Sequence, residues 1–579
     1  MKKTVLCMAL AALSAGSALN AAVSLTGGTS VSLSGILADA ENAPAKNVMA
    51  YSGNSLYASG NFDTAFGEMS PLTTSDAFII KYSTGMVEQW KVQLMGSATV
   101  SAMLADGDGG IYVAGTYADE VVVGSTDGNT KTINGYEEYG EPVAFKAASF
   151  VAHYNAEGVL LAVGTIMPTQ DAELNNYATE NGLWAMILEG DTYCRVSKLL
   201  DLNGSVHAVV DFKGAISTAD NSVAVASGSY ANVEFGLAAP SAAGAVVEFN
   251  DALEVVSFPV VLKSRFCGDG NTADENVSSL TAAAVGSQLY VAFNSVGTIN
   301  VSAYNTSEQV VNEMPVEGGH NYGYTIVSAN AETKEAQVKN YTTVSVSEDT
   351  QATSIGDMEV AGDKLIVTGM FQTALGFDSD ITATSSSDMY VAAINTSDLN
   401  TAWAVATGYN EGDANDYNEA ITGSAIFGDV AYIYGCNEQK SDRAKQASLF
   451  YSVDLADGTI ENMNPEDYIF GMAGDGTSAA TAHTTVPVSG ITFTAYGEFA
   501  GVDNIAADKT QQVSVYPNPV ADVLNFSLPC DAQVYALDGS LMLSAADAKS
   551  LDVTGLTGGV YIVKITVAGE TSYIKIMKK

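Results

Sequence analysis

Short apolar segments separated by turn-forming residues recur along most of the chain. "GNSLYASGNF" (53–62) precedes "SDAFIIKYSTGMVEQWKVQL" (75–94), and "GGIYVAGTY" (109–117) precedes "ASFVAHYNAEGVLLAVG" (148–164). Further copies pair "NSVAVASGSY" with "GAVVEFNDALEVVSFPV", "DKLIVTGMF" with "SDMYVAAINTSDLNTAWAVATG", and "DVAYIYGC" with "ASLFYSVDLADGTIE". Apolar and polar residues alternate within many of these segments, and Gly, Asn or Asp stands at the breaks. This pattern predicts antiparallel strands joined by tight turns.

Each unit predicts a short strand, a turn, an apolar strand that often ends at Gly, a variable loop and a hairpin. The distance from Gly60 to Gly115 is 55 residues, and that from Gly369 to Gly435 is 66 residues. Four strands in such a period are typical of a propeller blade, whereas an immunoglobulin-like sandwich needs about seven strands and about 100 residues. The sequence therefore predicts an all-β fold, a β-propeller of six to eight blades with seven favoured. Residues 167–213 and 317–354 fit the pattern poorly, and "SQLYVAFNSVGTINVSAYNTSEQVV" is a degenerate copy.

The first two units also resemble a known family. In "DAFIIKYSTGMVEQW…GGIYVAGTY" a D-x-F-hydrophobic-x-K-Y strand precedes a G-x-hydrophobic-Y-V-x-G strand. This order is similar to that of the bacterial seven-bladed β-propeller repeat family. The later units match the family less closely.

The pattern and the charge both change near the C-terminus. A polar connector, "AGVDNIAADKTQQ", leads into short strands, and residues 510–579 carry six acids and five lysines, a net charge of −1, against −42 for the whole chain. We expect a propeller over 22–500, a linker over 501–512 and a small immunoglobulin-like β-sandwich over 513–579. We also expect the linker to be the site at which proteases cut.

The terminal unit closely resembles the type A C-terminal sorting domain of the type IX secretion system of Bacteroidetes. The resemblance rests on "VYPNPVADVLNF", "VYALDGSLML", "LDVTGLTGGVYIVKI" and the final "YIKIMKK", which occur in the family's order and spacing. It implies export through the outer membrane by that machinery, followed by cleavage of the domain and release or attachment to surface lipopolysaccharide. The alternative is an ordinary adhesive sandwich module. The motif residues are Tyr516, Pro517, Asn518, Pro519, Gly539, Leu556, Gly559, Tyr561 and Lys575.

The N-terminus has the features of a signal peptide. Lys2 and Lys3 precede the apolar run "TVLCMALAAL" and the small residues "SAGSALNAA", so we expect residues 1–21 to be removed. The apolar run is too short to span a bilayer, which argues against a membrane anchor, and we expect no transmembrane segment elsewhere. Together with the sorting domain, this predicts a protein of the extracellular space or the outer-membrane surface.

The charge balance narrows the set of partners. The chain has 66 acidic and 24 basic residues, and only three of the basic residues are arginines. Nucleic acids need clustered Lys or Arg, and they are therefore excluded as expected partners. Four cysteines follow the signal peptide, namely Cys194, Cys267, Cys436 and Cys530, and their wide spacing excludes metal-finger and thioredoxin-type motifs without fixing any disulfide pairing.

Few residues indicate chemistry. The four histidines show no metal-binding spacing, and no nucleophile elbow, phosphate loop or dinucleotide fingerprint is present. The most distinctive cluster is "ADGDGG" (105–110), in which Asp106 and Asp108 alternate with glycine. Calcium is one interpretation, and a hairpin turn of a blade is the other. We expect no other cofactor.

Two functions remain open at this point. The preferred one is a binding or scaffolding module for glycan or extracellular protein, because propeller loops present variable surfaces at the ends of the fold. Loops 118–147 and 372–387 are the expected contact regions. The alternative is a propeller-fold enzyme acting on polysaccharide or lactone, and the fold does not distinguish the two. Because no catalytic group can be assembled from the motifs, the sequence favours binding over catalysis.

Overall fold

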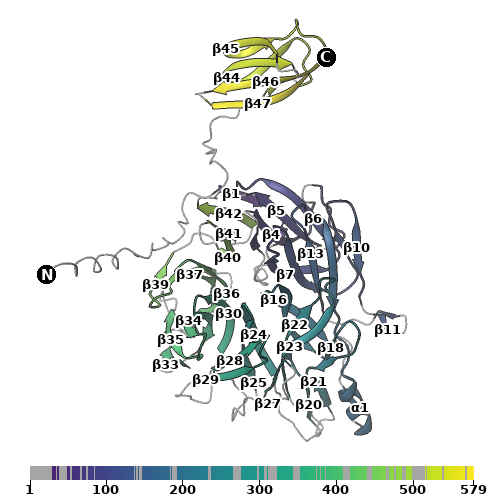
Figure 1. The fold of residues 1–579 in the computed structure, drawn as a ribbon, viewed down its shortest axis with the longest axis vertical. Helices are drawn as coiled ribbons and strands as arrows, with labels where there is room; N and C mark the ends of the chain where they lie inside the picture. The colour runs from purple at the N-terminus through teal and green to yellow at the C-terminus, as the bar shows by residue number, and fades with distance from the viewer. Residues whose placement is uncertain are drawn as a thin grey trace, which may run out of the picture. The chain divides into compact units, whose positions relative to one another are not determined.

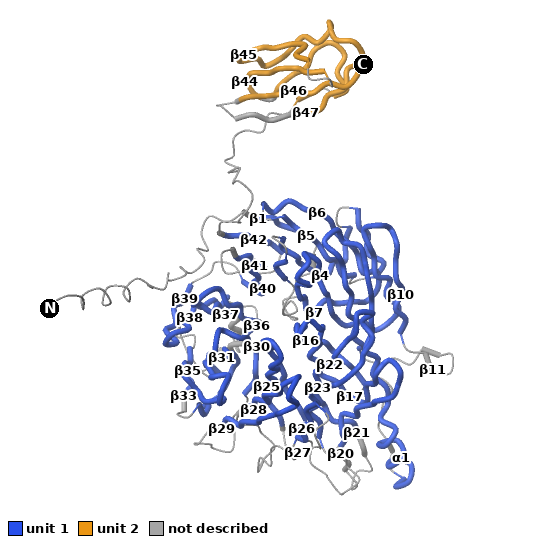
Figure 2. Tube along the Cα trace, viewed as in Figure 1, with its two compact units in different colours: residues 1–500 blue, residues 501–579 orange. Residues whose placement is uncertain are grey.

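The computed structural model describes residues 29–497 and 515–579, apart from segments between strands, the longest of which are 38–48, 265–275, 311–322, 343–352 and 408–416. The chain divides into two compact units, residues 1–500 and 501–579 (Figure 2). The expected signal peptide (1–21) and linker (501–512) lie outside the described residues. Within the part described, no helix is long and apolar enough to cross a membrane.

The first unit is built from antiparallel sheets whose strands follow one another in chain order. Seven of its sheets contain at least four strands among the described residues. In chain order they are β3 (Met49–Ser52), β4 (Ser55–Phe62), β5 (Asp76–Ser83) and β6 (Glu88–Met95); β7 (Ala98–Ala105), β8 (Ile111–Tyr117), β13 (Ala148–Tyr154) and β14 (Leu160–Ile166); β16 (Tyr193–Leu202), β17 (Ser205–Lys213), β22 (Ala243–Phe249) and β23 (Val255–Ser264); β24 (Asn276–Val285), β25 (Gln288–Val296), β28 (Gly323–Asn330) and β29 (Ala336–Thr342); β30 (Thr353–Ala361), β31 (Lys364–Phe371), β34 (Asp388–Asn395) and β35 (Thr401–Thr407); β36 (Tyr417–Phe427), β37 (Val430–Gln439), β38 (Gln446–Asp454) and β39 (Ile460–Asn462); and β40 (Tyr468–Gly474), β41 (Ser478–Thr484), β42 (Ile491–Gly497) and β1 (Thr29–Leu33). We number these sheets one to seven.

The remaining elements lie in insertions or at the edges of these sheets. They are β2 (Ile36–Leu37), β9 (Val121–Gly124), β10 (Thr130–Ile133), β11 (Glu137–Glu138), β12 (Glu141–Pro142), helix α1 (Ala172–Glu180), β15 (Trp184–Ala185), β18 (Ala215–Ser217), β19 (Ala224–Ala226), β20 (Ser229–Asn232), β21 (Leu237–Pro240), β26 (Ile299–Ala303), β27 (Gln309–Val310), β32 (Ala374–Gly376) and β33 (Asp380–Thr382).

The seven sheets form a closed ring. The first strand of each sheet contacts the first strand of the next, from β3 through β7, β16, β24, β30 and β36 to β40, and β40 contacts β3 again. Figure 1 shows β7, β16, β24, β30, β36 and β40 around the middle of the unit. The ring is completed by the first strand of the sequence, because β1 pairs with β42, the last strand of this unit. The pairing runs from Thr29↔Ala495 to Leu33↔Ile491. The predicted β-propeller is therefore confirmed.

The core lies between the sheets. Each of the seven large apolar clusters of this unit joins side chains of two neighbouring sheets. Tyr57 of sheet one and Phe150 of sheet two share one cluster, and Tyr82 of sheet one contacts Phe493 of sheet seven at a centroid distance of 6.2 Å. Because both faces of a sheet are covered only by its neighbours, no sheet has a complete core of its own.

In sheets one to six, the third and fourth strands are joined by the same kind of turn. Each contains a residue in the left-handed region, with φ between 56° and 81°, at Met86, Gly158, Leu253, Lys334, Leu399 and Gly458. Two of these turns also join neighbouring sheets through a tryptophan. Trp90 Nε1 donates to the carbonyl of Ala156 at 3.0 Å, and Trp403 Nε1 donates to that of Leu455 at 3.2 Å. A Cβ added to Gly158 or Gly458 would lie 2.7 Å from the indole concerned.

One repeat copy was assigned wrongly from the sequence. "NSVAVASGSY" (221–230) matches the second-strand pattern, but it contributes β19 and β20 to the insertion between β17 and β22. The second strand of sheet three is β17, which lies within the poorly fitting segment 167–213. The sequence signal was the pair Asn203 and Gly204, with φ of 57° and 80°, which forms the β16–β17 turn. Asn-Gly is the strongest two-residue hairpin signal.

The second unit is one five-stranded sheet with an apolar core of its own. Its strands are β43 (Val515–Tyr516), β44 (Val523–Ala536), β45 (Leu541–Asp552), β46 (Gly559–Val567) and β47 (Glu570–Lys578). The long strand β44 pairs with β43, β45 and β46, and β46 pairs with β47. Side chains such as Leu524, Val534, Val563 and Ile576 are buried between them. The immunoglobulin-like arrangement of this unit stays a prediction.

The contact between Trp90 and the next sheet's turn can be tested with a pair of glycine variants. Gly158 and Gly204 have almost the same φ, 81° and 80°, but nothing lies within 4 Å of a Cβ at Gly204. Gly204→Ala should therefore lower the free energy of unfolding by about 1 kcal/mol, because only the backbone is strained. Gly158→Ala should lower it by about 1–3 kcal/mol more, because the added Cβ would lie 2.7 Å from the indole and 2.6 Å from Thr126 Cγ2. Denaturant unfolding of both variants measures the difference, and equal losses would contradict the proposed packing role.

Candidate functional site

The strands around the centre of the ring share an irregularity that changes which way their side chains point. Six of the seven first strands have a shift in the pairing with their second strand, and in each the shift skips one residue. Such bulges locally bend a strand and redirect its side chains. The shifts fall at Val100/Ala102, Val196/Lys198, Val277/Ser279, Ile355/Asp357, Ile421/Gly423 and Ile469/Gly471.

Two of these shifts are followed by charged residues that meet across the ring. Lys198 of sheet three donates from Nζ to Asp357 Oδ1 at 3.0 Å, to the Met358 carbonyl at 2.7 Å and to Glu359 Oε1 at 2.7 Å. These three acceptors belong to sheet five, so the lysine reaches past sheet four. The side chains of Lys198 and Asp357 are 11% and 5% exposed, whereas that of Glu359 is 36% exposed.

The carboxylate of Asp357 extends this network to the neighbouring sheets. Its Oδ2 accepts from Ser424 Oγ of sheet six at 3.1 Å, and its Oδ1 lies 3.5 Å from Thr281 Oγ1 of sheet four. Four consecutive sheets, three to six, are therefore tied to one buried carboxylate. We call Lys198, Asp357 and Glu359 the axial network.

The electrostatics of the axial network favour a fixed charge over a reactive one. Burial lowers the pKa of Lys198, but the Asp357 and Glu359 carboxylates outweigh it and hold this pKa above its ordinary value. A protonated lysine whose three N–H groups all have acceptors is neither a nucleophile nor a base. The axial network is thus a structural tie. No local sequence pattern reveals it, because Lys198 and Asp357 are 159 residues apart.

One end of the ring carries the tight turns, and the other carries the insertions between second and third strands. The insertion that contains loop 118–147 forms the hairpin β9–β10, and β9 pairs with β6 of the preceding sheet, Leu94↔Val123 and Met95↔Val122. In the same way β26 pairs with β23, and β32 in loop 372–387 contacts β29. The insertions therefore cover the outer strand of the sheet before them, a role that their sequences did not reveal. The two tyrosines of loop 118–147 that are suited to sugar or protein contact, Tyr136 and Tyr139, lie outside the described residues.

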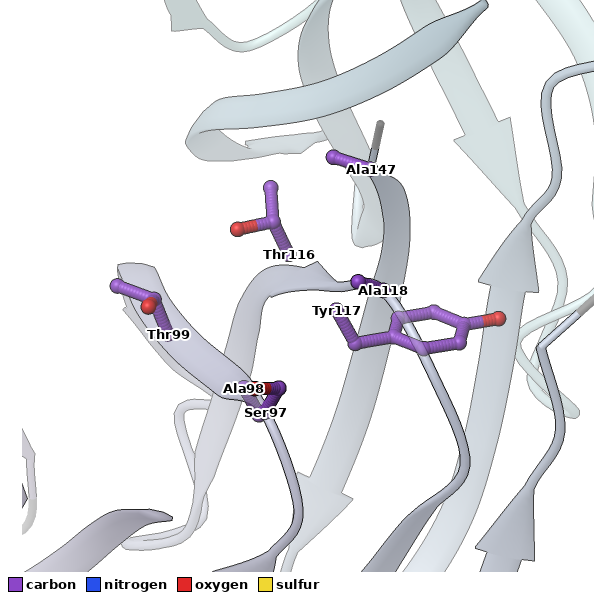
Figure 3. Close-up of a pocket in the computed structure, with 7 residues that line it drawn as sticks. All are labelled: Ser97, Ala98, Thr99, Thr116, Tyr117, Ala118 and Ala147. Carbon is purple, nitrogen blue, oxygen red and sulfur yellow. The ribbon is translucent and has the colours of Figure 1, made fainter. Parts of the chain in front are cut away.

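A pocket of about 160 Å³ opens at the base of the first of these insertions. It lies where β7 begins, β8 ends and β13 is about to begin, and it is lined by Ser97, Ala98, Thr99, Thr116, Tyr117, Ala118 and Ala147 (Figure 3). Thr99 and Thr116 are directly paired across β7 and β8, so both side chains lie on one face of the sheet. The pocket thus offers hydroxyl groups, with the Tyr117 ring turned away from them in Figure 3.

The aspartates considered for calcium lie in the β7–β8 turn. Asp106 Oδ1 accepts from the N–H groups of Asp108 and Gly110 at 2.9 and 2.7 Å, and Asp106 Oδ2 lies 3.0 Å from His153 Nε2. The Asp106 carboxylate is therefore engaged within the protein, and among the described residues no group of three or more His, Cys, Asp or Glu side chains could hold a metal ion. A calcium site at Asp106 and Asp108 stays a prediction.

The described histidines each have a local partner. His153 also stacks on Tyr112 at 4.0 Å, and His483 Nε2 lies 2.9 Å from Thr494 Oγ1. His207 Nδ1 lies 3.0 Å from the Ser205 carbonyl, and burial lowers the pKa of His207. His320 lies outside the described residues. Cys194 and Cys530 are free and buried.

The described sorting-motif residues lie in β43, β46 and β47 and in the segments next to them. Asn518 Nδ2 donates to the Lys575 carbonyl at 2.9 Å, and Asn518 Oδ1 accepts from the Met577 N–H at 2.9 Å. This side chain therefore binds the last strand on both sides of Ile576, as a ladder partner would. Leu556 is buried in the core, and Tyr561 donates to the Thr557 carbonyl at 2.9 Å. Pro517 and Gly539 lie outside the described residues.

The comparisons with known proteins agree with this division of the chain. Residues 514–579 match the family described as secretion system C-terminal sorting domain. The tail thereby identifies a substrate of the type IX secretion machinery, and it indicates export to the cell surface or the extracellular space, which confirms the expected localisation. No curated protein matches the chain.

Solved structures similar to the chain include two β-propellers and a polysaccharide lyase. The Dos1 propeller has 11% identity and a TM-score of 0.37, and the similarity covers 81% of this chain and 94% of that one. The β-propeller domain of the Trilobed protease from Pyrococcus furiosus has 9% identity and a TM-score of 0.35, with 80% and 98% covered. A polysaccharide lyase, Uly1, has 10% identity and a TM-score of 0.31, with 71% and 90% covered. The assignment of the fold depends on the ring of sheets itself.

Removing the cation of the axial network should destabilise the ring. Lys198→Met leaves the Asp357 carboxylate buried without its counter-charge. This should lower the free energy of unfolding by about 3–5 kcal/mol. Lys364→Met is the matched control, because Lys364 pairs at 3.0 Å with Asp363, whose side chain is 85% exposed, and a surface pair contributes about 0–1 kcal/mol. Denaturant unfolding measures both losses, and equal small effects would show that the network does not hold the sheets together.

Proposed function

We propose that the exported propeller is a binding module of the cell surface or the extracellular space, and that it recognises a glycan or protein through the end of the ring that carries the insertions. An N-terminal signal peptide belongs to the same proposal, because a protein reaches the type IX machinery only after it has crossed the inner membrane. An origin in Bacteroidetes also belongs to it, because the sorting domain resembles the one found in that group.

The observation that supports binding is the contrast between the centre and the insertion end of the ring. At the centre, the charged side chains of the axial network satisfy one another. At the insertion end, the pocket presents the paired threonines Thr99 and Thr116 beside Ser97. Hydroxyl groups of this kind donate and accept hydrogen bonds, as the hydroxyls of a sugar or the backbone of a peptide do.

Export can be tested by removing the sorting domain. A chain that lacks residues 510–579 should accumulate in the periplasm of its native host, because the remaining unit no longer carries the tail that the type IX machinery recognises. Fractionation with immunodetection measures this, and circular dichroism of the truncated chain checks that the first unit is still folded. Truncated protein at the surface or in the medium would contradict the prediction.

Binding can be tested with the full-length protein on a glycan array and in a pull-down, next to a screen for turnover of polysaccharides and lactones. We expect ligand binding without turnover. Thr99→Val and Thr116→Val should each weaken that binding up to about tenfold, because each removes a hydroxyl but keeps the shape of the side chain.

Thr333→Val is the matched control for these variants. Thr333 is exposed in the turn between β28 and β29, at the end of the ring opposite the insertions, and its loss should leave binding unchanged. Turnover of a polysaccharide or lactone that is lost when one carboxylate is replaced would overturn the proposal in favour of an enzyme.

A further inference from the structure

Four polar side chains share one face at the start of sheet three. In the register of β16 and β17, Tyr193 lies opposite Lys213, and Arg195 lies opposite Asp211. Directly opposed residues, and residues two apart on one strand, project from the same face of a sheet. Tyr193, Arg195, Asp211 and Lys213 therefore form a two-by-two patch, which we call the Arg195 patch.

Arg195 is held in place by an aromatic ring and is open to solvent. Its guanidinium carbon lies 4.4 Å from the centroid of the Tyr193 ring. The side chains on either side of it along β16, those of Cys194 and Val196, are buried in the core between sheets two and three, whereas Arg195 is exposed. A cation–π contact limits the orientations of the guanidinium without using its N–H donors.

The charge of the Arg195 patch is unusual for this chain. Acidic residues outnumber basic ones by 66 to 24, yet neither Arg195 nor Lys213 takes part in an ion pair among the residues the structure describes. Asp211 is half-buried, and burial raises its pKa to about 6 although Arg195 opposes this effect. Two cations thus face one carboxyl group, and the patch is positive on an otherwise acidic protein.

The Arg195 patch adjoins the hydroxyl-lined pocket. Ala147, which lines the pocket, forms a β-bridge with Tyr193, and its carbonyl accepts from the Cys194 N–H at 2.9 Å. On the neighbouring strand β7, Ser101 follows Thr99 by two residues, and its Oγ donates to the Val196 carbonyl. This hydrogen bond holds β7 against β16. The pocket and the patch therefore lie at the same end of the ring, with the start of β16 between them. Thr116 lies on the same face of β8 as Ala114, which packs against sheet three, whereas Arg195 lies on the face of sheet three that points away from sheet two. A ligand that contacts both must cross the end of β16.

We infer that the Arg195 patch binds the carboxylate of an acidic glycan whose neutral hydroxyls contact the adjoining pocket. This inference rests on the proposed binding function and names its ligand class. The planar guanidinium presents two parallel N–H donors that match a carboxylate, and Lys213 adds a second positive charge.

The net charge of the protein further limits the class of acidic glycan that can bind. A chain of net charge −42 repels a long polyanion, and that repulsion acts over about 10 Å at ordinary ionic strength. The ligand that fits both features is a mainly neutral oligosaccharide with a single uronic acid. A short acidic peptide would offer the same carboxylate, and its binding is therefore one outcome of the test.

The experiment uses full-length protein and two probes that differ in one group. The first is a tetrasaccharide of neutral hexoses that ends in glucuronic acid, and the second is the same tetrasaccharide ending in glucose. Isothermal titration at moderate salt should show that the wild type binds the acidic probe at least tenfold more tightly. Arg195→Gln should remove this preference, and Arg195→Lys should restore only part of it, because lysine keeps the charge but not the planar pair of donors.

Two further variants separate the patch from general charge effects. Asp211→Asn should bind the acidic probe equally well or more tightly, because it removes the carboxyl group that competes for Arg195. Lys364→Gln removes one positive charge elsewhere, where Lys364 pairs with Asp363, and it should leave the preference unchanged. Unchanged binding of the neutral probe by Arg195→Gln shows that this variant is folded.

The outcomes distinguish the inference from the proposed function. Equal binding of both probes by the wild type, or a preference that survives Arg195→Gln, would overturn the inference while the protein remained a binding module. Arg195-dependent binding of a short acidic peptide, with no binding of the acidic tetrasaccharide, would also overturn it. Cleavage of either probe would instead overturn the proposed function.

Discussion

Closure of the ring is the constraint on which the first unit depends. Each sheet buries its two faces only against its neighbours, and every large apolar cluster of this unit lies between two sheets. A gap at any position would expose two apolar faces. The last gap is closed by β1, which pairs with β42 across more than 450 residues of sequence. The entropy of closing such a loop rises only slowly with its length, so two distant strands can complete one sheet.

The closed ring gives the unit two different ends. At one end the chain turns in few residues, and the repeated left-handed residue between third and fourth strands fixes the shape of each hairpin. At the other end the second and third strands are joined by insertions of different length. Two of these insertions extend the preceding sheet, which covers an outer strand that would otherwise present unpaired N–H and C=O groups. These insertions are also the part of the unit that differs most from one sheet to the next in length and pairing.

The charged groups of the unit follow the same division. Lys198 and Asp357 are nearly excluded from water, so their separation would leave an unpaired charge in a medium of low dielectric constant. Arg195, on the same strand as Lys198, lies at the insertion end, exposed and without an ion-pair partner among the described residues. One strand thus carries both a cation that ties sheets together and a cation that is open to a ligand. The bulge at Val196/Lys198 lies between them.

The sequence by itself determined the strands, the turns and the nature of the tail. Alternation as in Phe78-Ile79-Ile80-Lys81-Tyr82 and turn pairs such as Asn203-Gly204 act between neighbouring residues, so their effect can be read locally. The motifs of the tail could be recognised for the same reason. Only the tertiary structure decided that β1 closes the ring, that Lys198 meets Asp357 across its centre, and that β9 covers β6. These contacts join residues that are about 30 to 460 positions apart, and no local pattern records a pairing that is formed only when the sheets pack.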